Sequence, residues 1–288
     1  MKYLDILNLN KLNIEKNFFT FKNLKLSYLS SGKPKKGTLL IAHANGYSAG
    51  CYSYILRNFA HEYEIFALDF VGHGESESSL NFNNWLFFRD QILELVSHLN
   101  LQEVIGIGHS IGGASWLMAS KILKQKVKKL ILFDPTILTV PKLLLGKIIG
   151  NPLAKTALKR RKNFSTREQV AKLYRRFPAF ARWDEEPFQD YIQTCLKTTK
   201  DGVELACDPI LEAKIFNSLP VLSPLQYFFI STESHIIIPE NYTVCSPSTA
   251  KRIVKGNPNS TLTIMPNFTH FFPFEEKNWV LEKLRSLL

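Results

Sequence analysis

The segment Val104-Ile-Gly-Ile-Gly-His-Ser-Ile-Gly-Gly113 (VIGIGHSIGG) decides how the rest of the chain is interpreted. Its first half is an apolar run typical of a buried strand, and a helical pattern extends from residue 110 to about 124. Ser110 stands at the turn between them, with Gly108 two residues before it and Gly112 two residues after it. A sharp strand-to-helix turn favours glycine at both positions and presents the serine hydroxyl. From the five residues 108–112 (GHSIG) alone, a nucleophilic serine and a tightly packed glycine loop are equally good interpretations.

The flanking sequence alternates short apolar runs with longer amphipathic ones. Residues 18–29 are predicted to form a hairpin around Lys22-Asn23, and further strands are predicted at 37–44, 63–70, 104–108, 128–134, 225–231 and 261–265. Helices are predicted at 85–99, 110–124, 247–256 and 274–287. This repeated β-α-β order indicates an α/β fold with a mostly parallel central sheet and helices on both faces.

The alternation stops after Pro135 and resumes near residue 222. Between them, residues 137–221 show helical or irregular patterns and no convincing strand. We therefore predict a core formed by residues 1–136 and 222–288, interrupted by a helical cap at 137–221. Residues 141–200 contain 14 Lys and Arg against 5 Asp and Glu, which is +9 of the chain's net charge of +11. Charge confined to one segment argues against a nucleic-acid-binding protein.

The composition fits a large globular domain. The chain has 288 residues, of which 45% are hydrophobic. Its first residues contain no uninterrupted apolar run of the kind that a secretory signal needs, and no apolar run reaches the roughly 18 residues of a membrane span. Cys51, Cys195, Cys207 and Cys245 show no CxxC spacing and no metal-ligand pattern. We expect a cytoplasmic protein with reduced thiols and no bound metal.

Three further motifs accompany the serine motif. They are His43-Ala44-Asn45-Gly46 after an early strand, Asp69-Phe-Val-Gly-His-Gly-Glu-Ser76, and Asn267-Phe-Thr-His-Phe-Phe-Pro273 after the last strand. In this order the four motifs resemble the oxyanion loop, the D-x-x-G-H-G-x-S turn, the nucleophile turn and the histidine loop of the α/β-hydrolase superfamily. The resemblance implies an α/β-hydrolase fold over nearly the whole chain, least clearly in the cap. His43, His73 and His109 lie inside these motifs, where histidines more often brace loops than take part in chemistry.

The resemblance also implies roles for particular residues. Ser110 would be the nucleophile, and His270 would act first as general base and then as general acid. The main-chain N–H groups of Asn45 and Ile111 would bind the oxyanion. Ala44 departs from the family pattern, which usually has glycine there; its methyl group narrows the loop but leaves the donor in place. No cofactor is required.

The acid that would complete the triad has two candidates. Asp134 ends a predicted strand in LILFDP, a position that one branch of the superfamily uses. Glu233 lies near the position that most members use, after the predicted strand 225–231, although the alignment puts Ser234 at the acid's place. We favour Asp134 and keep Glu233 as the alternative acid.

The cap is expected to shape the substrate pocket. Its aromatic residues Phe177, Phe180 and Trp183 would line that pocket or attach the cap to the core. Residues 140–162 alternate basic and apolar side chains. This pattern fits a surface that touches anionic lipid, and it also fits a solvated helix face above a buried apolar one.

These observations favour a cofactor-independent serine hydrolase, most simply a carboxylesterase that acts on small to medium acyl esters through an acyl-enzyme. An acyltransferase or a C–C bond hydrolase with the same triad is the alternative enzyme. A ligand-binding receptor or inactive homologue is the non-enzyme alternative, although such proteins usually lack the nucleophile or the histidine.

Overall fold

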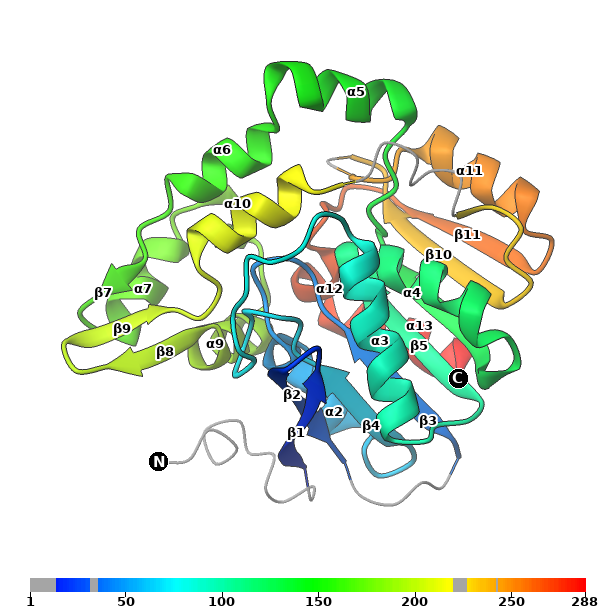
Figure 1. Ribbon diagram of the computed structural model, residues 1–288, viewed down its shortest axis with the longest axis horizontal. Helices are drawn as coiled ribbons and strands as arrows, with labels where there is room; N and C mark the ends of the chain where they lie inside the picture. Colours follow the sequence, from blue (N-terminus) through cyan, green and yellow to red (C-terminus); the bar gives the residue numbers. More distant parts are fainter. Residues whose placement is uncertain (1–13, 32–35, 220–226, 242) are drawn as a thin grey trace.

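An eight-stranded sheet forms the centre of the molecule (Figure 1). The computed structural model describes residues 14–31, 36–219, 227–241 and 243–288. The strand order across the sheet is β1-β2-β4-β3-β5-β6-β10-β11. These strands are β1 (Glu15–Phe21), β2 (Leu24–Ser30), β3 (Thr38–Ala42), β4 (Glu64–Leu68), β5 (Val104–His109), β6 (Val127–Phe133), β10 (Glu233–Pro239) and β11 (Ser260–Met265).

The sheet is mostly parallel, as the sequence predicts. From β4 to β11 every neighbouring pair is parallel, whereas β2 runs antiparallel to both β1 and β4. The predicted hairpin joins β1 and β2 through a two-residue turn, in which Lys22 and Asn23 have φ angles of 46° and 67°. Positive φ at both central residues is the geometry of a tight hairpin turn, and it explains the asparagine.

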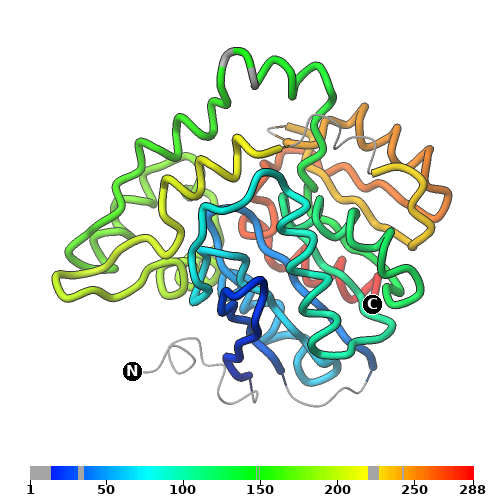
Figure 2. Tube along the Cα trace, in the orientation of Figure 1, coloured from blue at the N-terminus to red at the C-terminus, as the bar shows by residue number. Residues whose placement is uncertain are grey.

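Helices cover both faces of the sheet (Figures 1 and 2). One face packs against α3 (Leu86–His98), α4 (Ile111–Leu123) and α11 (Pro247–Gly256). The other face packs against the short 3-10 helix η2 (Ala49–Tyr52), α2 (Ser53–Phe59), α12 (Phe272–Glu275) and α13 (Lys277–Leu287). A second 3-10 helix, η3 (Lys124–Lys126), precedes β6. Alternate side chains serve the two faces: Leu40 and Ala42 face the first layer, and Leu39 and Ile41 face the second.

A largely helical region is inserted between β6 and β10, as predicted. It contains α5 (Val140–Ile149), α6 (Pro152–Leu158), α7 (Arg167–Tyr174), α8 (Pro178–Ala181), α9 (Glu185–Thr194) and α10 (Pro209–Asn217). The expectation that it holds no strand is wrong. The strands β7 (Asn163–Phe164), β8 (Leu196–Thr199) and β9 (Gly202–Leu205) form a small antiparallel sheet. Lys200 and Asp201 form the two-residue turn between β8 and β9, and Gly202 begins β9 opposite Thr199.

The predicted strand at 225–231 is also wrong. Residues 225 and 226 lie outside the described part of the chain, and residues 227–231 form no strand. Phe229 explains why, since its φ of 59° is left-handed and its ring is 87% exposed. The strand is instead β10, which pairs with β6 on one side and β11 on the other. The predicted border between cap and core near 221 also falls outside the described residues.

The α8–α9 part of the insertion is attached to the core by aromatic stacking and ion pairs. The Trp183 ring stacks on Phe274 with 4.1 Å between centroids. Arg57 on α2 pairs with Glu186 and Asp190 on α9, at 2.7 Å and 2.5 Å. Trp183 therefore attaches the cap to the core, which was one of its two predicted roles.

The cysteines are all free thiols and buried, although Cys51 and Cys195 lie with their sulfur atoms 3.2 Å apart. Across the ranges that the structure describes, no helix has both the length and the apolar character needed to span a membrane.

Two glycines offer a matched test of the packing. A Cβ on Gly112 of α4 would lie 2.1 Å from the Ala42 carbonyl oxygen, whereas a Cβ on Gly146 of α5 would meet nothing within 4 Å. We expect Gly112→Ala to lower the free energy of unfolding by about 3 kcal/mol. Gly146→Ala should leave it unchanged or raise it by up to about 1 kcal/mol. Urea denaturation of both variants measures this, and equal midpoints would contradict the packing described.

Candidate active site

Ser110 occupies a strained turn between β5 and α4. Its φ of 56° and ψ of −117° are unusual for a residue with a side chain. The Ser110 N–H donates to the Phe133 carbonyl, and the Ser110 carbonyl accepts from the Thr136 N–H, both at 3.0 Å. A Cβ on Gly108 would lie 2.7 Å from the Gly113 backbone. The strand-turn-helix context predicted for the serine motif is therefore the observed one, and both of its glycines are sterically required.

Asp134 and His270 meet beside this turn. His270 lies in the loop after β11, and its Nδ1 is 2.7 Å from Oδ2 of Asp134, which follows β6. The Asp134 carboxylate is fully buried. It also accepts hydrogen bonds from the Thr243 hydroxyl at 2.5 Å and from the Val244 and Cys245 N–H groups at 3.1 Å and 3.2 Å. These donors stabilise the carboxylate in a site without water contact.

Glu233, the alternative acid, lies elsewhere. It is the first residue of β10, whereas its predicted role required it to follow a strand. Its carboxylate contacts the His235 ring at 2.7 Å and the Lys129 ammonium at 3.3 Å. The interpretation of Glu233 depended on the misplaced strand at 225–231, and the structure brings Asp134 to His270 instead.

The loop after β3 brings Asn45 to the same site. The Asn45 side-chain amide donates to the Glu212 carbonyl at 3.1 Å, and the Gly46 N–H donates to Nε2 of His73 at 3.0 Å. Asn45 Oδ1 is buried and has no partner among the described atoms. Ile111 is the first residue of α4, so its N–H has no acceptor within the helix. Asn45 and Ile111 both line the cavity that Ser110 lines.

Three histidines inside the motifs brace these loops. His43 Nε2 accepts from the Phe70 N–H at 2.9 Å. His109 Nε2 donates to the His270 carbonyl at 3.0 Å, and its Nδ1 lies 2.7 Å from the Tyr52 hydroxyl. Burial lowers the pKa of His43 and His109 well below the ordinary value, and it lowers the pKa of His73 to about 4. Neutral imidazoles can donate at one nitrogen and accept at the other, as these bonds require.

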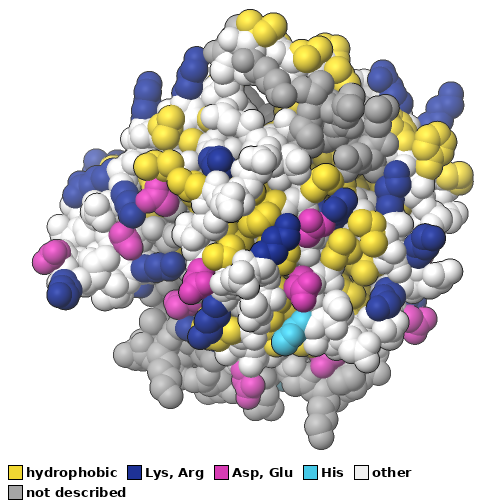
Figure 3. Space-filling model, in the orientation of Figure 1, with side chains coloured by type: hydrophobic (Ala, Val, Ile, Leu, Met, Phe, Trp, Pro, Cys, Tyr) yellow, Lys and Arg dark blue, Asp and Glu magenta, His cyan; other side chains and the backbone are white. Residues whose placement is uncertain are grey.

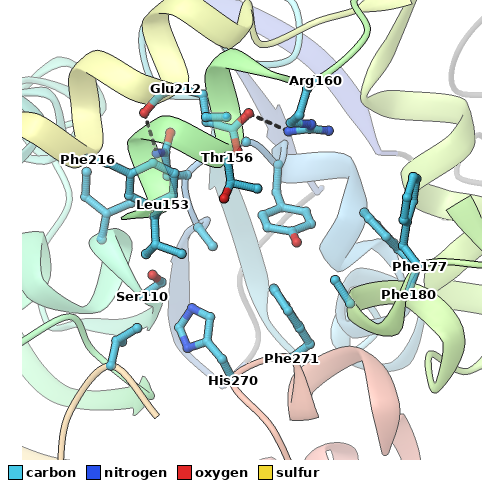
Figure 4. A pocket seen from close by; sticks show the side chains of 18 of the residues that line it. Ser110, Leu153, Thr156, Arg160, Phe177, Phe180, Glu212, Phe216, His270 and Phe271 are labelled. Atoms are coloured by element: carbon cyan, nitrogen blue, oxygen red, sulfur yellow. Dashed lines mark hydrogen bonds and ion pairs between the residues drawn. The ribbon is translucent and has the colours of Figure 1, made fainter. Parts of the chain in front are cut away.

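A cavity of about 900 Å³ lies above Ser110 and His270, between the core and the insertion. Figure 4 shows the Ser110 hydroxyl and the His270 ring facing the same space. Phe177 and Phe180 line this cavity, whereas Trp183 does not and packs against the core. Over the described ranges, no group of three or more His, Cys, Asp or Glu side chains is placed to hold a metal ion.

An ion pair that sequence reasoning missed lies at the cavity wall. Nη1 of Arg160 is 2.5 Å from Oε2 of Glu212, as Figure 4 shows. Nη2 of Arg160 donates to the hydroxyls of Tyr191 and Tyr174, at 3.0 Å and 3.2 Å. Because the Glu212 carbonyl also holds Asn45, this cluster connects the insertion to the loop beside Ser110. Arg160 is one of many basic residues in its segment, and no local pattern distinguishes it.

Sequence reasoning also missed two residues that contact the site, Thr136 and Glu275. The Ser110 Oγ lies 3.0 Å from the Thr136 Oγ1. Glu275 is buried and accepts from the Thr269 hydroxyl at 2.6 Å and from its N–H at 3.1 Å, which fixes the loop that carries His270. Their roles depend on contacts made through the fold, so no sequence spacing predicts them.

Comparison with known proteins places the chain in a family. Residues 37–276 match the family of the alpha/beta hydrolase fold, and the chain therefore belongs to the α/β-hydrolases. A Haemophilus influenzae protein provisionally named esterase/lipase is 26% identical over 235 residues, which cover 81% of this chain and 77% of that protein. A Mycoplasma genitalium protein provisionally named esterase/lipase 2 is 32% identical over 121 residues. That match covers 40% of this chain and spans 44% of the relative's length.

Solved structures agree on the fold. The thioesterase domain from the curacin biosynthetic pathway superposes with a TM-score of 0.76 at 18% identity, and the match covers 95% of this chain and 99% of that domain. At this identity the likeness shows the fold alone.

The buried histidines predict how stability depends on pH. Because the pKa of His73 falls from 6.5 to about 4 on folding, the unfolded chain binds a proton there that the folded chain does not. The free energy of unfolding should therefore fall as pH drops from 6.5 to 4, by about 1.4 kcal/mol per pH unit for this residue. We expect His73→Gln to remove that share of the slope in urea denaturation at a series of pH values. An unchanged slope would show that His73 does not remain neutral in the folded protein.

Proposed function

We propose that this α/β-hydrolase is a cofactor-independent serine hydrolase that acts on carboxylic esters of small to medium acyl groups. Ser110, His270 and Asp134 are the proposed triad. The observation that carries the proposal is the 2.7 Å contact between His270 and Asp134 in the wall of a cavity that Ser110 also lines. The esterase/lipase names of the relatives support the ester as substrate class.

The first half of the proposed reaction forms an acyl-enzyme. Asp134 accepts from Nδ1–H of His270, so that Nε2 of the ring is left without a proton and can act as a base. His270 removes the Ser110 hydroxyl proton as Oγ attacks the ester carbonyl. The negative charge that develops on the carbonyl oxygen is bound by the N–H groups of Asn45 and Ile111.

The second half returns the enzyme to its starting state. The imidazolium of His270 gives its proton to the leaving alcohol, and the acyl group remains on Ser110. Water then attacks the acyl-enzyme while His270 takes a proton from it. The carboxylic acid leaves, and the Ser110 oxygen recovers its proton from His270.

The cavity supports an acyl substrate over a highly polar one. Its volume of about 900 Å³ falls within the range of small-molecule pockets. Most of its side chains are apolar, including Leu153, Leu173, Phe177, Phe180, Phe216 and Leu219. Such walls bind an alkyl or aryl acyl group by removing it from water, and the volume allows a medium chain.

Removal of the nucleophile tests the proposal directly. Ser110→Ala should reduce kcat for nitrophenyl butyrate by about 10⁵-fold or more, because the proposed acyl intermediate forms on the Ser110 oxygen. Ser115→Ala is a matched control, since Ser115 is buried on the same helix and its hydroxyl has no partner among the described atoms. That variant should keep wild-type turnover. A fluorophosphonate probe should label the wild type at Ser110, and full activity in Ser110→Ala would refute the assignment.

The two carboxylates give a second, paired test. Asp134→Asn should lower kcat by about 10⁴-fold, because the amide can no longer hold the reactive tautomer of His270. Glu233→Gln should leave kcat unchanged, since Glu233 pairs with Lys129 and His235 on the surface. Ester hydrolysis by both variants, with added alcohol to detect acyl transfer, measures the difference. Loss of activity in Glu233→Gln alone would reverse the choice of acid.

A further inference from the structure

The helix α5 presents apolar side chains to solvent. Leu144 and Leu145 are 47% and 54% exposed, and Ile148 is 82% exposed. Of the α5 side chains that the structure describes, Leu143 alone is buried. A surface helix ordinarily buries its apolar face, and neighbouring exposed apolar residues are characteristic of an interaction site. The interpretation of 140–162 as a solvated face above a buried apolar one is therefore wrong for α5.

Positive charge surrounds this apolar face. Residues 140–162 contain seven Lys and Arg and no Asp or Glu. Lys142, Lys159 and Arg161 are exposed, whereas Arg160 and Lys162 pair with acidic residues. Figure 3 shows hydrophobic side chains at the top of the molecule, where α5 lies, with Lys and Arg side chains on both flanks. The segment therefore combines an apolar strip, formed by Leu144, Leu145 and Ile148, with the exposed positive charges of Lys142, Lys159 and Arg161.

The chain lines the cavity on both sides of α5. Leu138 and Asn151, which flank α5 in the sequence, both line the cavity. Leu153 and Phe177 also line it, and they are 50% and 47% exposed. At Leu153, on the helix that follows α5, the apolar lining therefore reaches the outer surface.

We propose that residues 140–162 form a docking surface for an anionic lipid bilayer. Leu144, Leu145 and Ile148 would enter the headgroup region among the acyl chains, and the Lys and Arg side chains would contact lipid phosphates. Two copies of this surface would repel each other, since neither carries an acidic residue between 140 and 162. An anionic bilayer supplies both the apolar interior and the negative charge. Docking does not involve Ser110, so the inference goes beyond the proposed function.

Flotation with lipid vesicles tests this inference. The wild type should bind vesicles of phosphatidylglycerol and phosphatidylcholine at low salt, and bind pure phosphatidylcholine vesicles more weakly. A triple variant with Leu144→Ser, Leu145→Ser and Ile148→Ser should bind the anionic vesicles about tenfold more weakly or worse, because it loses the apolar contact. A matched variant with Leu80→Ser, Ile122→Ser and Ile264→Ser changes exposed apolar residues outside the cap and should bind like the wild type.

Charge reversal and the catalytic variant complete the experiment. Lys142→Glu with Lys159→Glu should weaken anionic binding by at least about fivefold for each lysine replaced, and it tests the surface without changing the apolar strip. Ser110→Ala should bind like the wild type even if it loses activity. The inference is overturned if the wild type fails to bind anionic vesicles or if both cap variants bind as well as it does. It is also overturned if the wild type is a dimer that the triple serine variant converts to a monomer.

Discussion

The sharp turn at Ser110 is the constraint on which the rest of the site depends. The turn places α4 so close to β3 that Gly112 has no room for a side chain. The strained backbone at Ser110 costs about 1–3 kcal/mol. Hydrogen bonds from the Ser110 backbone to Phe133 and Thr136 offset this cost, and they fix the end of β6 against the turn. The position of Asp134, between those two partners, therefore follows from the turn that positions the serine.

The buried Asp134 carboxylate connects segments that are distant in the sequence. Its oxygen atoms accept from residues 243–245 on one side and face His270 on the other. An isolated carboxylate without water would be unstable, so the four donors around it are a structural requirement. The His270 loop is fixed independently by Glu275, so the imidazole is oriented from both ends.

Local patterns predict the parts of this structure that local chemistry determines. The hairpin at Lys22-Asn23 and the turn at Ser110 require particular residues within a few positions, and both could be predicted. The strand at 225–231 could not be excluded in this way, because Phe229 and its neighbours are as apolar as a strand. The strand β10 is determined by its partners β6 and β11. The choice between Asp134 and Glu233 depended on the position of this strand, and so it did not follow from the sequence alone.

The Arg160–Glu212 ion pair could not be predicted either. It joins residues 52 positions apart, and no periodicity in the sequence indicates it.

In the cap, too, local sequence patterns do not show contacts between distant residues, and so they do not show which side of α5 is buried. The structure adds a contact between the cap and the core that composition could not suggest. Asn45, in the proposed oxyanion loop, is held through its side chain by the Glu212 carbonyl on α10, and Glu212 is held by Arg160 beyond α6. The proposed oxyanion loop and the cap are therefore in direct contact, since the Glu212 carbonyl on α10 accepts the hydrogen bond from the Asn45 side chain.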